Sequence, residues 1–125
     1  MRKLEGEQVL MRIFIGESDR WEHRPLSLAL VELFRREGLA GATVLRGVAG
    51  FGPASIVHTA SFLRLSADLP LVIEVVDSQE RIDKVLPRID DMMAGGLVTL
   101  ERVRVIRYEE GRPSGPARPP GGPGS

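Results

Sequence analysis

The stretch "LPLVIEVVDSQERIDKVLPRIDDMMAGGLVTLERVRVIRY", residues 69–108, decides the fold. Residues 69–76 carry apolar side chains at alternate positions, which predicts a strand. Asp77 is expected to cap a helix, with Glu80 as its capping-box partner. The apolar stripe of that helix consists of Ile82, Val85, Leu86, Ile89, Met92 and Met93. Gly95 and Gly96 end the helix, and residues 97–108 form another strand, so this stretch reads strand, helix, strand.

The last of these strands does not alternate evenly. Its pattern slips near Glu101 and Arg102, which predicts a bulge or a bend at that point.

The preceding residues repeat the same order. Residues 8–15 alternate as a strand, residues 25–38 have helical spacing from Pro25 to Gly38, and residues 42–48 form a second strand. The whole order is β-α-β-β-α-β, the ferredoxin-like arrangement of the α+β class. We expect a four-stranded antiparallel sheet with two helices on one face.

The other face of this sheet is not cleanly polar. Leu10 and Phe14 in the first strand, and Val72 and Val76 in the third, point away from the predicted core. A sheet face that meets water should be polar, so these residues indicate a second burial surface, which favours an oligomer. Scattered exposed apolar residues, which need no partner, are the alternative.

Composition limits the function. The 125 residues suit one domain, and 17 basic residues balance 17 acidic ones, which argues against a general nucleic-acid binder. The chain has no cysteine, which excludes disulfides, thiolate zinc sites and cysteine nucleophiles. No segment approaches the roughly 20 apolar residues of a membrane span, so we expect a cytoplasmic protein without direct membrane insertion.

The end of the chain differs in composition from the rest. Residues 1–109 are expected to fold, whereas residues 110–125 are rich in proline and glycine and are expected to be a disordered tail. A proline-rich docking peptide is the alternative for this tail.

A glycine-rich turn follows the second strand. Gly47, Gly50 and Gly52 are spaced G-x-x-G-x-G behind Arg46, which differs from the dinucleotide and P-loop patterns. Glycines let a ligand approach the backbone, and Arg46 offers a partner for an anion. A twisted strand end with a bulge is the simpler alternative.

The connection from Phe51 to Asp68 is long for a hairpin, and long connections often carry function. It contains Ser55, His58 and Arg64. Ser55 and His58 raise the alternative of a hydrolytic enzyme, although no nucleophile-elbow motif surrounds the serine. The spacing of His23 and His58 predicts no metal site.

Three blocks resemble a known family: "GATVLRGVAGFG" at 41–52, "DLPLVIEVVD" at 68–77 and "GLVTLERVRVIRY" at 96–108. They are similar to the PII-like family labelled domain of unknown function 190, which is related to the PII nitrogen-signalling and CutA proteins. The resemblance implies a homotrimer with inward-facing sheets and nucleotide bound in clefts between subunits. It implies a ligand site at Gly50, Phe51, Gly52 and Arg107, to which the residues themselves add Arg46 and Gly47 just before this match. Several PII phosphate-binding positions differ here, with Pro53, Ala54 and Leu71 in place of polar or cationic residues.

The resemblance and the residues together predict a regulatory protein, not an enzyme. An anionic effector, with a nucleotide as first candidate, would bind between subunits and signal through residues 51–68, including Ser55, His58 and Arg64. No other cofactor is expected. The alternative is a ligand-free trimeric adaptor for a protein partner such as a membrane transporter or channel.

Overall fold

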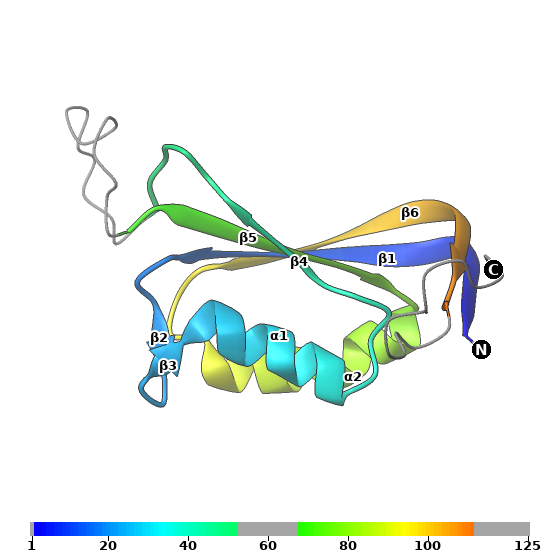
Figure 1. Cartoon of the computed structure of the whole chain (residues 1–125), viewed down its shortest axis with the longest axis horizontal. Helices are drawn as coiled ribbons and strands as arrows, with labels where there is room; N and C mark the ends of the chain where they lie inside the picture. Colours follow the sequence, from blue (N-terminus) through cyan, green and yellow to red (C-terminus); the bar gives the residue numbers. More distant parts are fainter. Residues whose placement is uncertain (1, 53–67, 112–125) are drawn as a thin grey trace, which may run out of the picture.

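The computed structural model describes residues 2–52 and 68–111 of the chain. The main elements follow in the expected order, with a small hairpin between the first strand and the first helix (Figure 1). Their bounds are β1 (Lys3–Gly16), β2 (Arg20–Trp21), β3 (Arg24–Pro25), α1 (Leu26–Arg36), β4 (Thr43–Arg46), β5 (Pro70–Asp77), α2 (Gln79–Met92) and β6 (Leu97–Glu109).

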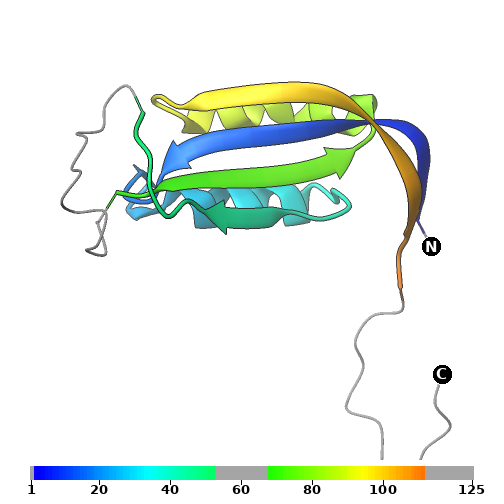
Figure 2. The ribbon, with the colours of Figure 1, turned by 90° about the horizontal axis from the view of Figure 1, so that it is seen from above.

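Four strands form one antiparallel sheet in the order β4-β5-β1-β6. Figure 2 shows them side by side, with both helices behind the sheet, and Figure 1 shows that the helices cover one face only. The predicted ferredoxin-like α+β fold is therefore confirmed. The N-terminal strand β1 occupies the centre, since it pairs with β5 on one side and β6 on the other.

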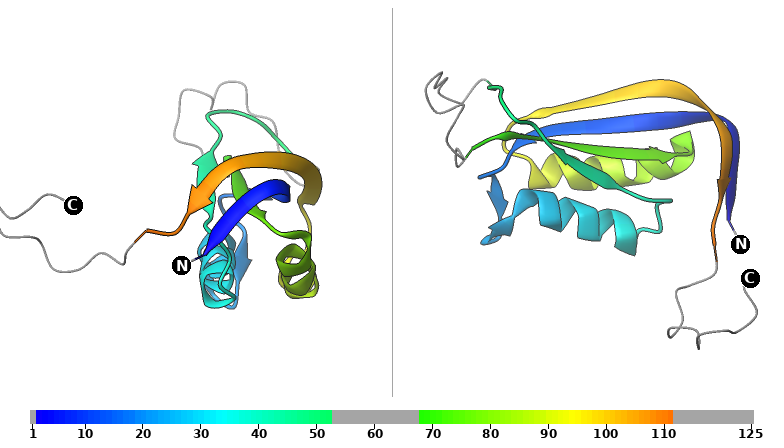
Figure 3. Two further views of the ribbon diagram at one scale, coloured as in Figure 1. Left: turned by 90° about the vertical axis from the view of Figure 1, so that its right-hand side faces the viewer. Right: turned by 45° about the horizontal axis from the view of Figure 1, so that its top comes forward.

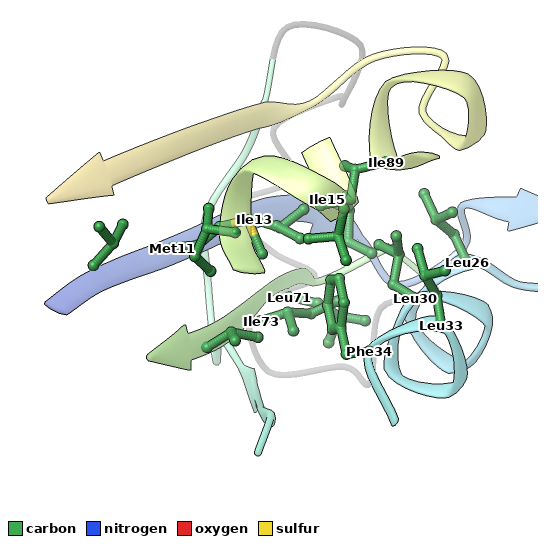
Figure 4. Close-up of a cluster of buried hydrophobic side chains, with 14 residues drawn as sticks. Met11, Ile13, Ile15, Leu26, Leu30, Leu33, Phe34, Leu71, Ile73 and Ile89 are labelled. Atoms are coloured by element: carbon green, nitrogen blue, oxygen red, sulfur yellow. The ribbon is translucent and has the colours of Figure 1, made fainter. Parts of the chain in front are cut away.

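The core lies between the sheet and the helices. The inward residues of β1 alternate as predicted, and they pack against the apolar stripes of both helices (Figure 4). Met11 and Ile13 of β1, Leu30 of α1 and Ile82 of α2 are completely buried. Burial of this kind stabilises a fold by roughly 1.5–3 kcal/mol per large apolar side chain, which explains why period-two and helical patterns predicted these elements.

The face of the sheet away from the helices, here called the open face, combines charge with apolar surface. Arg12 of β1 lies near its centre, with Nε 2.8 Å from Oε2 of Glu74 and a terminal nitrogen 3.1 Å from Oε1 of Glu101. The hydrogen bond to Glu74 raises the pKa of Arg12 above its usual value. The apolar residues of this face include Leu10, which is buried, and Phe14, Leu45, Val72, Val76, Leu97 and Val103.

The N-cap of α2 corrects one expectation. The cap is Ser78, whose hydroxyl accepts a hydrogen bond from the backbone N–H of Arg81, and not Asp77. Glu80 consequently lies one residue too early for a capping box. Asp77 is instead buried at the end of β5, where its carboxylate accepts hydrogen bonds from Arg2 and from the backbone N–H groups of Ala40 and Ser78. Tertiary contacts, which the local pattern does not contain, decide between two residues that both cap helices well.

Of the bulge or bend predicted at Glu101 and Arg102, the bulge is absent. These residues pair in regular register with Leu10 and Val9, and the shift lies further along, between Leu4 and Gly6 of β1. Gly6 has a φ of +78°, a conformation that glycine adopts most easily. Beyond this point β1 and β6 continue as a two-stranded ribbon that bends across the end of the sheet (Figure 3).

Candidate functional site

Arg46 is the last residue of β4, and its partner Leu71 in β5 pairs in turn with Ile15 near the end of β1. Its Nε is 2.6 Å from Oε2 of Glu17, and a terminal nitrogen is 3.0 Å from Oε1 of the same carboxylate. Both side chains are partly exposed. This two-point geometry is the one in which a guanidinium binds a carboxylate or a phosphate. Arg46 is thus positioned as an anion-binding group, and an internal anion already pairs with it.

The glycines behind Arg46 pack closely on Pro70, the first residue of β5. Gly47 donates its backbone N–H to the carbonyl oxygen of Pro70 at 2.7 Å. A Cβ at Gly47 would lie 2.7 Å from Cγ of Pro70, and one at Gly50, which has a φ of +150°, would lie 3.0 Å from it. The turn therefore needs glycine at both positions for its own geometry. This packing explains both glycines by the geometry of the turn alone.

Two apolar side chains project from this turn. Val48 is 82% exposed and Phe51 is 71% exposed. Exposed apolar side chains of this size next to a polar pair are typical of a contact surface.

The turn after β1 holds both ends of the connection between β4 and β5. Glu17 pairs with Arg46 at the beginning of that connection, and the backbone N–H of Glu17 donates to Leu69 O at 2.8 Å at its end. The hydroxyl of Ser18 donates to Oδ1 of Asp68 at 2.8 Å. We call residues Glu17 and Ser18 the clasp, because they bind both stems of the same segment.

The other predicted arginine, Arg107, lies at the far end of the sheet. Arg46 is level with Leu71 and Ile15 at one end of β1, whereas the neighbour of Arg107, Tyr108, pairs with Leu4 at the other end. Arg107 lines a hollow of about 490 Å³ with Tyr108 and residues 40–43. A single chain therefore does not bring Arg46 and Arg107 together.

Of the remaining predicted residues, Gly52 is the last one described before residue 53. Ser55, His58 and Arg64 lie outside the described residues, as does the tail after residue 111. Within residues 2–52 and 68–111, no three histidine, aspartate or glutamate side chains gather as metal ligands. Neither helix in this part of the chain is long and apolar enough to cross a membrane.

Sequence reasoning missed the clasp. Glu17 and Ser18 follow a strand in the run "GESD", where acidic and hydroxyl residues are typical of any turn. One signal was available. In the predicted sheet the first two strands run parallel, so the acidic turn after the first strand and Arg46 at the end of the second lie at the same end of the sheet.

Two solved structures have a similar arrangement of helices and strands. A PII-like signaling protein from Thermus thermophilus superposes with a TM-score of 0.56 at 20% identity, over 85% of this chain and 94% of that one. CPII from Thiomonas intermedia K12, a nitrogen regulatory PII-like protein bound to ADP, AMP and bicarbonate, superposes with a TM-score of 0.55 at 16% identity, over 83% and 91% of the two chains. The chain has the PII-like fold.

Sequence comparisons identify the family to which the chain belongs. Residues 8–105 match the family called domain of unknown function 190, described as Uncharacterized ACR, and the chain belongs to this family. A UPF0166 protein of Aquifex aeolicus (strain VF5) is 38% identical over 97 residues, covering 78% of this chain and 91% of that protein. A UPF0166 protein of Methanocaldococcus jannaschii is 33% identical over 101 residues, covering 80% and 93%.

Proposed function

We propose that this protein is a regulatory sensor that binds an anionic effector, with an adenine nucleotide as the first candidate, and does not catalyse a reaction. The observation that carries the proposal is the PII-like fold, which it shares over most of its length with CPII, a protein solved with ADP, AMP and bicarbonate. The position of Arg46 adds support, because its guanidinium already holds two anionic oxygens at the stem of the connection to β5.

The proposed effector site comprises Arg46 and the turn with Gly47, Gly50, Phe51 and Gly52, and it includes Arg107 from a neighbouring copy. The separation of Arg46 and Arg107 within one chain supports a site between subunits, since only a second chain would supply the missing cation. Residues 51–68, with Ser55, His58 and Arg64, would then report the bound state to a partner such as a transporter. We expect this sensor to work in the cytoplasm.

The proposed assembly is a homotrimer that buries the open face. Leu45 and Leu97 on this face are about half exposed, and they flank Val72 and Phe14 in one row across the sheet. A monomer gains nothing from presenting apolar side chains of this size to water, whereas an interface buries them. The same interface would bring the strand ends of different copies near each other, as a shared effector site requires.

A ligand-free adaptor is the second candidate, and one observation favours it. The charge of Arg46 is already matched by Glu17, while Val48 and Phe51 beside it are exposed. An adaptor needs an apolar contact surface of this kind and no free cation. In that case the turn binds a protein, and no small anion competes for it.

Calorimetric titration with ADP separates the two candidates. The sensor predicts saturable binding that weakens about 10- to 100-fold in Arg46→Ala, because a charge-assisted pair with phosphate is lost. Arg88→Ala is the matched control, since Arg88 is similarly exposed and pairs with Glu37 at 3.1 Å on the helical layer. Binding that is equal in wild type and Arg46→Ala would rule out the proposed site. An absence of binding to ADP, ATP and AMP would leave the adaptor as the better explanation.

A further inference from the structure

The clasp contains a contact that an effector at Arg46 has to break. Glu17 binds the Nε edge of the Arg46 guanidinium through both carboxylate oxygens, at 2.6 and 3.0 Å. Two oxygens of a phosphoryl group would use the same edge with the same geometry. The two anions cannot occupy it together.

Glu17 is held at this place by its backbone. Its N–H donates to Leu69 O, and the neighbouring Ser18 binds Asp68 through both its hydroxyl and its backbone N–H. Gly16, just before it, approaches Asp68 so closely that a Cβ would lie 2.4 Å from Oδ1. The carboxylate of Glu17 therefore remains tethered beside Arg46 even when their ion pair is open.

From this arrangement we infer that Glu17 is an internal competitor for the effector, and that the Arg46 site consequently selects phosphate-bearing anions over free monocarboxylates and bicarbonate. The inference rests on the proposed function, because it deepens the same site. Glu17 is a positioning and selectivity residue and does not belong to the effector-binding groups.

The selectivity follows from the tether. A group held next to its partner by a short segment has an effective concentration on the order of millimolar or more. A free carboxylate offers Arg46 the same single charge and the same two oxygens, so below that concentration it does not displace Glu17. A phosphoryl group carries more charge and a third oxygen, which gives it further donors to bind.

The test is a titration of the full chain with ADP in wild type, Glu17→Gln and two controls. Glu17→Gln retains the shape of the side chain and removes its charge. The variant no longer has the ion pair that ADP must displace, nor the negative charge that repels the phosphates. Each of these contributes modestly to the binding free energy at an exposed site, so we expect ADP to bind about five- to tenfold more tightly. Glu37→Gln removes a comparable partner from Arg88 and should leave ADP affinity unchanged.

Ser18→Ala separates competition from loosening. It breaks the hydroxyl contact with Asp68 and leaves the Glu17 charge in place, so competition predicts wild-type affinity. Equal tightening in Ser18→Ala and Glu17→Gln would overturn the inference, since both variants would then act by loosening the clasp. Unchanged affinity in Glu17→Gln, with binding still lost in Arg46→Ala, would overturn it and leave the proposed function standing.

Bicarbonate tests the selectivity directly. We expect no Arg46-dependent binding of bicarbonate to wild type at concentrations below about 1 mM. Micromolar binding that disappears in Arg46→Ala would contradict the selectivity. Arg46→Ala without effect on ADP binding would refute the proposed site and the inference together.

Discussion

Asp77 joins parts of the chain that are far apart in sequence. Its buried carboxylate accepts hydrogen bonds from the Arg2 side chain near the N-terminus and from the backbone N–H of Ala40 before β4. Arg2 also donates to the carbonyl oxygen of Gly38, and Arg81 reaches the same oxygen. One carboxylate therefore fixes β1, the end of α1, β5 and α2 relative to one another.

Replacing Asp77 by asparagine tests this role. The side chain keeps its shape, but Arg2 loses its anionic partner in a part-buried place, so we expect a loss of about 2–4 kcal/mol in the free energy of unfolding. Urea denaturation measures it. Asp91→Asn, at an exposed position of α2, should change stability by no more than about 0.5 kcal/mol. Equal effects of both variants would contradict the structural role of Asp77.

The adjacent glycines Gly95 and Gly96, before β6, differ in the space available for a side chain. Gly96 has a φ of +100°, and a Cβ there would lie 2.7 Å from the carbonyl oxygen of Phe14, whereas a Cβ at Gly95 meets no heavy atom within 4 Å. We expect Gly96→Ala to cost about 2–4 kcal/mol and Gly95→Ala to cost less than about 1 kcal/mol. Thermal unfolding of the two variants decides this, and similar melting temperatures would show that the turn relaxes freely.

Helix α2 contains an internal defect. Pro87 lies inside the helix, where it removes one backbone hydrogen bond. We expect Pro87→Ala to raise the free energy of unfolding by about 1–3 kcal/mol. Lys84→Ala, on the exposed surface of the same helix, serves as the control with little change. A destabilised Pro87→Ala would indicate instead that the proline ring packs against Leu86 and Met93, which line the same shallow hollow.

The elements that the sequence predicted well are those with long regular patterns. β5, α1 and α2 each bury an apolar stripe of the expected period, and Gly38, with a φ of +75°, follows α1 as predicted. The hairpin of β2 and β3 was missed because two-residue strands have no period. Its turn residues Glu22 and His23 both have positive φ, which neither residue type signals.

The candidate site was predictable in part. Arg46 and the glycine turn stand out locally, because a cation followed by glycines is a recognisable pattern. Glu17 pairs with Arg46 only through the folded sheet, and no local spacing connects the two. The contacts that modify a site are therefore harder to predict than the groups that form it.

For the molecule as a whole, the apolar residues of the open face lead to a testable prediction about assembly. Leu45 on the open face and Leu28 on α1 are both 48% exposed. If copies associate through the open face, Leu45→Lys dissociates the assembly while Leu28→Lys does not, because only the first places a charge in the interface. Light scattering after gel filtration measures the mass of both variants. A monomeric wild type, or dissociation by Leu28→Lys alone, would contradict burial of the open face.

The central place of β1 has a consequence for how the chain is made. β1 leaves the ribosome before β5 and β6, yet Val9 pairs with Asp77 of β5 on one side and with Arg102 of β6 on the other. The two edges of this apolar strand therefore lack their partners until β5 and then β6 have been synthesised. Such distant pairings slow folding, and unpaired strand edges invite aggregation. During synthesis, β1 therefore has to stay free of foreign strands until β6 has emerged.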